Sequence, residues 1–143
     1  MTGRTLSSDA DYRELLTQVK RIVVVGLSPK PHRDSHRVSA YLQSVGYQIV
    51  PVHPRGGTTL GVPVHTSLTD ACRSVLPDLV NVFRRPDALP ELMDEALPLG
   101  LRNFWLQFGV THSGAEAQAL AAGANLVVDR CLLVEHRRLI GHS

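Results

Sequence analysis

The sequence predicts an α/β protein in which a parallel sheet carries helices on both faces. Short apolar runs such as residues 22–25 alternate with longer segments of helical periodicity, which is the pattern of strands joined by crossover helices. Gly26 ends the first run, and a tight loop then leads into a helix, a corner that binds phosphates in such folds. Together these observations predict a Rossmann-like doubly wound parallel sheet with right-handed crossovers.

Composition restricts what kind of protein this is. The 143 residues fit one domain, 1–143, with an N-terminal helix at 8–20 and a core at 21–135. A net charge of +2 does not argue for nucleic acid, and no apolar run is long enough to span a membrane. Cys72 and Cys131 lack metal-site spacing and suggest reduced thiols. We therefore expect a cytoplasmic protein with no nucleic-acid or membrane partner.

The predicted elements follow from periodicity and from capping residues. The first helix begins at Ser7 or Ser8, and the second begins at Asp34 or Ser35. Strands are expected at 22–25, 47–52, 62–65, 79–83, 103–108 and 126–128, and further helices at 67–75, 87–100 and 113–123, the last capped by Ser113. A basic tail follows Cys131. The default strand order is 3-2-1-4-5, with a sixth strand possible.

The loop after the first strand has the chemistry of an anion site but not a dinucleotide fingerprint. In the GxGxxG frame only Gly26 is present, so the motif is weak evidence for NAD. Ser28 offers a hydroxyl to a phosphate, and Lys30 and Arg33 make the loop strongly positive. Cations at a helix start oppose the helix dipole, so we expect a bound polyanion here rather than a merely solvated basic surface.

The loop after the second strand bears on the type of nucleotide. NAD sites place an Asp or Glu there to hold the ribose hydroxyls, whereas this chain has Val52, His53, Pro54 and Arg55. The missing acid and the nearby Arg55 favour a ligand with an extra ribose phosphate, which fits both NADP and coenzyme A. A proline-glycine turn with a surface arginine explains this loop by itself equally well.

The remaining strand ends supply fewer candidates. Arg84 and Arg85 follow the fourth strand, and one of them is expected to face a phosphate or a carboxylate while the other is a surface residue. Gln107 is a polar residue at the end of a buried strand and needs a partner there. Trp105 and Phe108 are expected to be core residues, and Cys131 a packed, unreactive cysteine.

Catalytic machinery is not evident in the sequence. GxSxG, HExxH and Walker A motifs are all absent, and no nucleophile stands in a recognisable spacing with a base. His32 and His36 have a spacing compatible with metal binding but only Asp34 beside them, so we expect no metal site. We expect the protein to bind a ligand without catalysis of its own.

Several motifs, in one order, resemble the small stand-alone coenzyme A-binding proteins. They are VVVGLSPKPHRDSHRV, YQIVPVHPRG, VPVHTSL, VNVFRRPD, WLQFGV and VVDRCL, and they cover residues 21–135. These proteins are bacterial single domains similar to the N-terminal domain of the succinyl-CoA synthetase α subunit. The resemblance implies coenzyme A as ligand, with its phosphates on Gly26, Ser28, Pro29 and Arg33. It also implies adenosine beside Val52, His53 and Pro54, although the family usually has Asn at position 53.

The sequence thus yields one set of candidate ligand-binding residues and several functions. The set is Gly26, Ser28, Pro29, Lys30, Arg33, Ser35, Val52, His53, Pro54, Arg55, Phe83, Arg84 and Gln107. The favoured function is binding of coenzyme A or an acyl-CoA as a sensor, carrier or accessory subunit. The alternatives are an NADP-dependent oxidoreductase and the coenzyme A-binding subunit of an acyl-CoA ligase. A homo-oligomer or a ligase-type protein partner is compatible with any of them.

Overall fold

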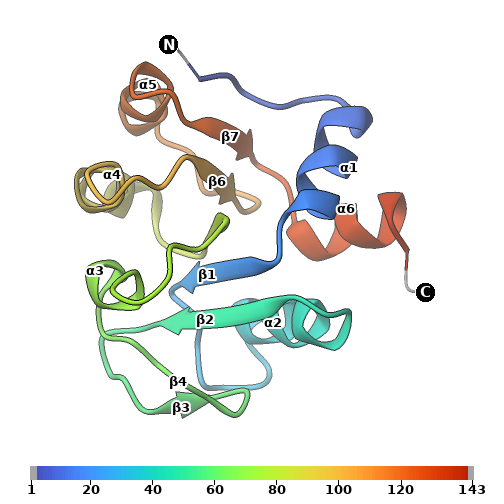
Figure 1. Ribbon diagram of the computed structural model, residues 1–143, viewed down its shortest axis with the longest axis vertical. Helices are drawn as coiled ribbons and strands as arrows, with labels where there is room; N and C mark the ends of the chain where they lie inside the picture. The colour runs from blue at the N-terminus through green and yellow to red at the C-terminus, as the bar shows by residue number, and fades with distance from the viewer. Residues whose placement is uncertain (1–2, 142–143) are drawn as a thin grey trace.

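A five-stranded parallel sheet forms the centre of the computed structural model, which describes residues 3–141 (Figure 1). Its strands are β1 (Arg21–Val25), β2 (Gln48–Val52), β5 (Leu79–Val82), β6 (Asn103–Leu106) and β7 (Asn125–Val128), in the order β2-β1-β5-β6-β7. The Rossmann-like prediction is confirmed, and so is the optional last strand, β7. The strands are rich in apolar residues because helices cover both faces of the sheet.

Helices lie on the two faces of the sheet in two groups. The helices α3 (Leu68–Ala71), α4 (Leu89–Ala96) and α5 (Ser113–Ala121) pack on one face, and a short 3-10 turn, η1 (Pro86–Ala88), precedes α4. The helices α1 (Asp9–Gln18), α2 (Asp34–Ser44) and α6 (Leu132–Leu139) pack on the other face. Successive β1 residues alternate between the two cores, with Val23 in one and Val24 in the other.

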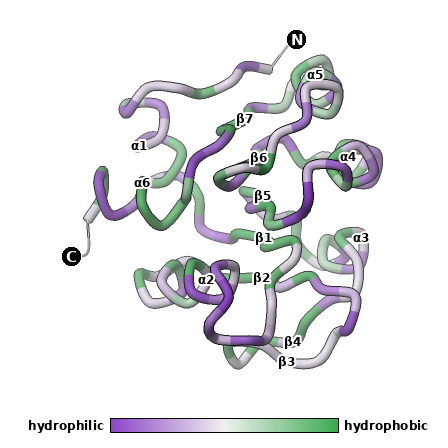
Figure 2. The backbone as a smooth tube through the Cα atoms, turned by 180° about the vertical axis from the view of Figure 1, so that it is seen from behind, coloured by the Kyte–Doolittle hydropathy of each residue, from purple (hydrophilic) through white to green (hydrophobic). Residues whose placement is uncertain are grey.

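The chain reverses its direction of winding beside β1. From β1 it crosses to β2 through α2, and it then returns past β1 to β5 on the other side. Ligands of open α/β sheets bind at such a switch point, outside the carboxyl ends of the strands. Figure 2 shows apolar β1 ending at this edge and the hydrophilic loop that leads to α2. The topology therefore puts the basic loop at the position where this fold binds ligands.

The predicted third strand, at 62–65, is wrong as a member of the main sheet. Val62–Pro63 (β4) instead pairs antiparallel with Thr58–Thr59 (β3) in a small hairpin. Leu60 and Gly61, with φ of 54° and 75°, form the tight turn that folds this segment back on itself. Only His65 reaches the sheet, as a single parallel bridge to Val52.

The opposite edge of the sheet is covered by the start of the chain. Thr5 forms a parallel bridge to Leu126 of β7, an interaction that the sequence did not predict. The amide of Leu6 donates to the carbonyl of Leu126 at 2.7 Å, and the amide of Leu126 donates to Arg4 at 3.0 Å. The short extra bridges at β2 and β7 leave little free sheet edge for pairing with another chain.

The predicted basic tail is in fact a packed helix, α6. His136 on this helix is only 3% exposed, and its Nδ1 lies 2.7 Å from the hydroxyl of Tyr41 on α2. Burial lowers the pKa of His136, which favours the neutral ring in this contact. The helix was missed because two of its inward positions carry polar residues, Glu135 and His136, which hid the apolar periodicity.

Two predicted helix caps are also wrong. Neither Asp34 nor Ser35 caps α2, because Arg33 occupies the N-cap position and makes no side-chain cap bond. At α5 the cap is His112, whose side chain accepts a hydrogen bond from Ala115, rather than Ser113. Ser8, by contrast, caps α1 as predicted.

Between residues 3 and 141, no helix is both long and apolar enough to cross a membrane. Over the same range, no group of three or more His, Cys, Asp or Glu side chains is arranged to hold a metal ion.

Candidate ligand site at the switch point

Gly26 makes the turn on which the site depends. Its φ is +89°, which L-residues rarely adopt. A Cβ at this position would also overlap the backbone carbonyl oxygen of Phe83, because the strands β1 and β5 end side by side here. The amide of Gly26 donates to the carbonyl of Val52 on β2 at 2.9 Å. Gly26 thus brings the ends of three neighbouring strands together.

The loop after Gly26 is held by two serines. The hydroxyl oxygen of Ser28 accepts a hydrogen bond from the amide of Lys30 at 3.1 Å. The amide of Ser28 donates to the hydroxyl oxygen of Ser35, which is only 5% exposed, at 3.0 Å. Ser35 therefore ties the loop to the first turn of α2 instead of capping the helix. These two hydrogen bonds restrain the loop between β1 and α2.

The start of α2 is open. The first hydrogen bond inside the helix runs from the amide of Arg37 to the carbonyl of Arg33, at 3.0 Å. The amides of Asp34, Ser35 and His36 thus belong to the first turn, where a helix offers no carbonyl to accept from them. Such amides, together with the positive end of the helix dipole, bind anions.

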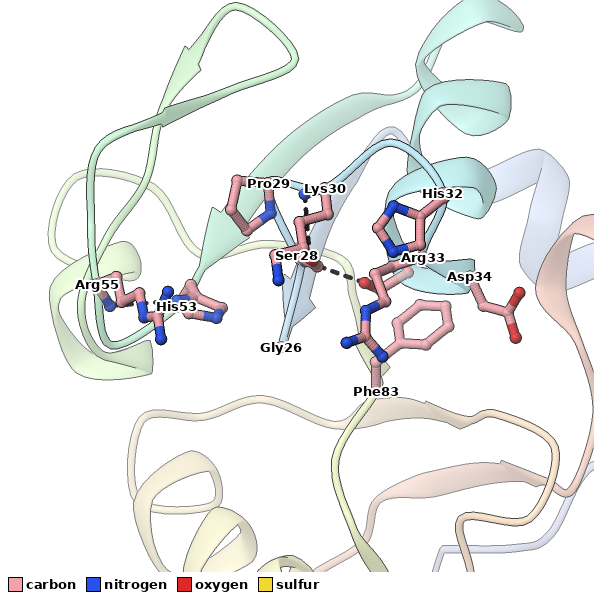
Figure 3. A pocket seen from close by; sticks show the side chains of 11 residues that line it. Gly26, Ser28, Pro29, Lys30, His32, Arg33, Asp34, His53, Arg55 and Phe83 are labelled. Atoms are coloured by element: carbon pink, nitrogen blue, oxygen red, sulfur yellow. Dashed lines mark hydrogen bonds between the residues drawn. The ribbon is translucent and has the colours of Figure 1, made fainter.

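A cavity of about 680 Å³ lies in front of this helix start. Figure 3 shows His53 and Arg55 on one side of the Gly26 turn, and Arg33 with the ring of Phe83 on the other. Lys30 and Arg33 extend from the loop itself, while His53 and Arg55 follow β2. The carboxylate of Asp34 points away from the other side chains in Figure 3 and pairs with Arg37 at 2.7 Å.

The cations at this edge are free of protein counter-ions. Within residues 3–141, no carboxylate forms an ion pair with Lys30, Arg33, Arg55 or Arg84. All four side chains are exposed. Like charges gathered around a positive helix end repel one another, and an anion between them would relieve this repulsion. We call this hollow the phosphate cavity.

Two further cavities adjoin the phosphate cavity. One, of about 200 Å³, shares Gly26 with it and is lined by Val52, Pro54 and Arg84 among others. The other, of about 450 Å³, shares Asp34 and Phe83 with it and extends over the ends of β5 and β6. The structure thus brings every candidate residue from the sequence to one edge of the sheet. Gly26, Ser28, Pro29, Lys30, Arg33, Ser35, His53, Arg55 and Phe83 line the phosphate cavity, and Val52, Pro54, Arg84 and Gln107 line the adjoining two.

Gln107 has the partners that its position demands. Its amide nitrogen donates to the side-chain oxygen of Asn81, and its own oxygen accepts from the amide of Leu132 at 3.4 Å. Phe108 differs from expectation, because it is 79% exposed rather than part of the core. The strand β6 ends at Leu106, so the alternation that buries Trp105 no longer determines where Phe108 points.

Sequence reasoning missed some lining residues. Glu91 and Glu95 on α4, with Thr66 and Ser67 before α3, line the smallest cavity. Glu91 and Glu95 stand four residues apart, which puts them on one helix face, and that spacing was the available signal. Glu95 accepts hydrogen bonds from the amide and hydroxyl of Thr69, at 2.9 Å and 2.8 Å. It therefore stabilises the start of α3 as well as lining the cavity.

These features define the class of protein: a Rossmann-like α/β domain with a cationic cavity at its switch point. Comparison with known proteins identifies the family. The model of the family described as "CoA binding domain" matches residues 20–137, and the chain belongs to that family.

Three relatives illustrate the extent of the similarity. YneT of Bacillus subtilis (strain 168), an uncharacterized protein, is 40% identical over 129 residues, which are 90% of this chain and 94% of YneT. The structure of cell-free ID.343 from Thermus thermophilus is 40% identical, with a TM-score of 0.87, and the match covers 93% of this chain and 99% of that one. A hypothetical protein from Pyrococcus horikoshii OT3 is 36% identical, with a TM-score of 0.88 and 94% of each chain covered.

Proposed function

We propose that the protein binds coenzyme A or an acyl-CoA, with the pyrophosphate at the open start of α2. The observation that carries the proposal is the group of unpaired cations around uncapped helix amides at the switch point. The pyrophosphate accepts hydrogen bonds from the first-turn amides of α2, and Lys30 and Arg33 balance its charge. Membership of the CoA binding domain family supports this ligand.

The loop after β2 receives the ribose end of the ligand. Arg55 and His53 line the phosphate cavity on the β2 side, across from Arg33 (Figure 3). Arg55 binds the 3′-phosphate, and the adenosine lies beside Val52, His53 and Pro54. His53 Nδ1 accepts from the amide of Arg55 at 3.2 Å, so the imidazole helps to shape this loop.

The protein acts by binding rather than by catalysis, as a sensor, a carrier or an accessory subunit of an acyl-CoA ligase. The lining of the phosphate cavity includes Lys30, Arg33 and Arg55, which are groups that hold phosphates, and its one carboxylate, Asp34, is paired with Arg37. His65 and Asp70 form a histidine–carboxylate pair, with 2.8 Å between Nδ1 and Oδ2. Neither residue lines any of the three cavities, so we assign the pair no role in chemistry on the ligand. The family match favours coenzyme A over NADP.

Calorimetric titration with coenzyme A, dephospho-CoA, NADP and NAD tests the proposal. We expect coenzyme A to bind most tightly and dephospho-CoA to bind about tenfold or more weakly, because the latter lacks the 3′-phosphate. NADP binding without any response to coenzyme A would overturn the assignment. If none of the four ligands bound, the result would argue that these cations do not form a site in the isolated chain.

Arg55→Ala locates the 3′-phosphate. This variant should bind coenzyme A and dephospho-CoA with nearly equal affinity, because the group that distinguishes them has gone. Arg73→Ala is the matched control, since Arg73 is another exposed arginine, pairs with Asp70 at 3.5 Å and lies outside all three cavities at the switch point. A preference for coenzyme A that survives in Arg55→Ala would move the 3′-phosphate elsewhere.

A further inference from the structure

The cavity of about 450 Å³ beside the phosphate cavity has a different chemical character. We call it the side cavity. It lies between the start of α2, the ends of β5 and β6, and the start of α6, and its lining is Asp34, Arg37, Val38, Phe83, Arg84, Arg85, Gln107, Phe108, Val110 and Cys131. Its volume falls within the range typical of small-molecule sites.

The side cavity continues the phosphate cavity in one direction. Asp34 and Phe83 line both, whereas Gln107, Phe108, Val110 and Cys131 line only the side cavity. A ligand whose phosphates lie at the start of α2 can therefore pass Phe83 and end among these distal residues. In coenzyme A the group at that end of the molecule is the thiol or the acyl group that it carries.

The distal residues present apolar surface. Val110 is 9% exposed and forms part of a core, while Phe108 is 79% exposed at the mouth of the cavity. Gln107 uses its side chain on Asn81 and on the amide of Leu132, so it is already engaged in the protein. Covering Phe108 would remove a large aromatic side chain from water, which favours an apolar occupant.

Three arginines line the side cavity, and none of them is among its distal residues. Arg37 pairs with Asp34 at 2.7 Å, and Arg85 pairs with Asp87 at 3.5 Å. Arg84 alone among these arginines has no ion pair within residues 3–141, and it also lines the smallest cavity beside Gly26. An acyl group that ended in a carboxylate would have Arg84 as its one unpaired cation in this cavity, and Arg84 is not among the distal residues that would contact the acyl group.

We propose that the ligand is an acyl-CoA with a short apolar acyl group, which lies in the side cavity against Phe108 and Val110. This inference rests on the proposed function, because it takes the position of the ligand's phosphates from it. It adds the class of acyl group, and it assigns Phe108 a role in distinguishing acyl-CoA from free coenzyme A.

Titration with acyl-CoA ligands of increasing acyl length measures how much the acyl group contributes to binding. Acetyl-, propionyl- and butyryl-CoA are compared with coenzyme A and succinyl-CoA, in the presence of a reductant that keeps all thiols reduced. Each added methylene should strengthen binding about fourfold, as expected for full burial of that group. Succinyl-CoA should bind more weakly than butyryl-CoA. Equal affinity along the series, or tightest binding of succinyl-CoA, would overturn the inference.

Phe108→Ala assigns the effect to the side cavity. Because Phe108 is largely exposed, the variant is expected to fold, and the gain per methylene should fall to about twofold or less. Val134→Ala is the matched control: Val134 is another exposed apolar residue, 52% exposed, on α6 and outside the side cavity. It should keep the full gain per methylene. A Phe108→Ala protein with an undiminished gain would refute the role of Phe108.

The two proposals fail in different ways. Loss of all coenzyme A binding would defeat the proposed function and this inference together. Coenzyme A binding that depends on the 3′-phosphate but not on acyl length would defeat the inference alone.

Discussion

Helices α1 and α2 lie on the same face of the sheet but begin in opposite ways. The hydroxyl oxygen of Ser8 caps α1 by accepting from the amide of Asp11 at 3.1 Å, and Asp9 and Asp11 place negative charge in its first turn. At α2, Arg33 occupies the N-cap position without a side-chain cap bond, and Lys30 and Arg33 surround the first turn. The one acid there, Asp34, is paired with Arg37.

The difference is between a helix start stabilised by a side-chain cap and one that, under the proposed function, binds the phosphates of the ligand. Capping and first-turn acids each stabilise a helix, by about 1 kcal/mol or less. The start of α2 has no side-chain cap and only one first-turn acid, Asp34, while Lys30 and Arg33 line the cavity beside it. A site for a dianionic group explains this arrangement, because the ligand then supplies the negative charge that α1 takes from Asp9 and Asp11.

Of the changes considered for the two helix starts, replacing Gly26, which makes the turn before α2, should have the largest effect. In Gly26→Ala, the alanine must adopt a left-handed backbone conformation, which costs about 1–2 kcal/mol. Its Cβ also overlaps the carbonyl of Phe83, which costs about 1–3 kcal/mol more. We expect the free energy of unfolding in urea to fall by about 3 kcal/mol. Gly46→Ala is the control, since φ there is +107° but no atom lies within 4 Å, so only the conformational cost remains. Equal losses in the two variants would contradict the overlap.

Removing one cation from the start of α2 should weaken the ligand without unfolding the protein. Arg33→Ala is expected to reduce coenzyme A affinity by ~1–3 kcal/mol, through loss of a charge-assisted hydrogen bond. Its stability should change by less than about 0.5 kcal/mol, because Arg33 is exposed and makes no side-chain cap bond. Arg13→Ala, at an exposed position of α1, serves as the control and should leave affinity unchanged. An unchanged affinity in Arg33→Ala would remove Arg33 from the site.

Removing the cap of α1 should lower the stability of the protein without weakening ligand binding. Ser8→Ala is expected to lower the free energy of unfolding by about 1 kcal/mol, since the amide of Asp11 loses its acceptor. Coenzyme A affinity should not change, because α1 lines none of the three cavities at the switch point. Chemical denaturation and calorimetry on the same preparation check both halves. A loss of affinity would mean that the two helix starts are coupled.

The smallest effect concerns pH and again lies at α1. Hydrogen bonding to the Arg4 guanidinium, with further hydrogen bonds from Ser8, lowers the pKa of Asp11 to about 2. In the unfolded chain an aspartate has a pKa of about 3.9. The Asp11–Arg4 pair therefore stabilises the folded protein above pH ~4, and this stabilisation is lost as the pH falls toward ~2. Thermal unfolding of Asp11→Asn should therefore depend less on pH across that window. An identical pH dependence in wild type and variant would contradict the assignment.

The sequence predicted the sheet well because its strands are buried on both faces. Such strands are continuous apolar runs, and residues 22–25 and 79–82 were recognisable without knowledge of their neighbours. The edges were harder to predict. Whether Val62 joins the main sheet or a hairpin depends on the backbone of Leu60 and Gly61, and whether Thr5 pairs with β7 depends on a residue 121 positions away.

The candidate site was predictable as a location more than as a set of contacts. The loops after parallel strands meet at one edge, so listing the residues there collected the lining of the phosphate cavity except for His32 and Asp34. Sequence alone did not reveal that Ser35 bonds to the amide of Ser28, since a serine at a helix start usually caps it. The exposure of Phe108 was missed for a similar reason, because apolar character suggested burial one residue beyond the actual strand end.

The bridge between Thr5 and Leu126 has a consequence for synthesis on the ribosome. Residues 4–6 emerge long before β7, so their hydrogen-bond partner does not yet exist while most of the sheet is being made. A contact of such long sequence separation also carries a high loop-closure cost, and it is expected to form late. The bridge at the outer edge of β7 thus forms only after β7, the last strand of the sheet in chain order, has been synthesised.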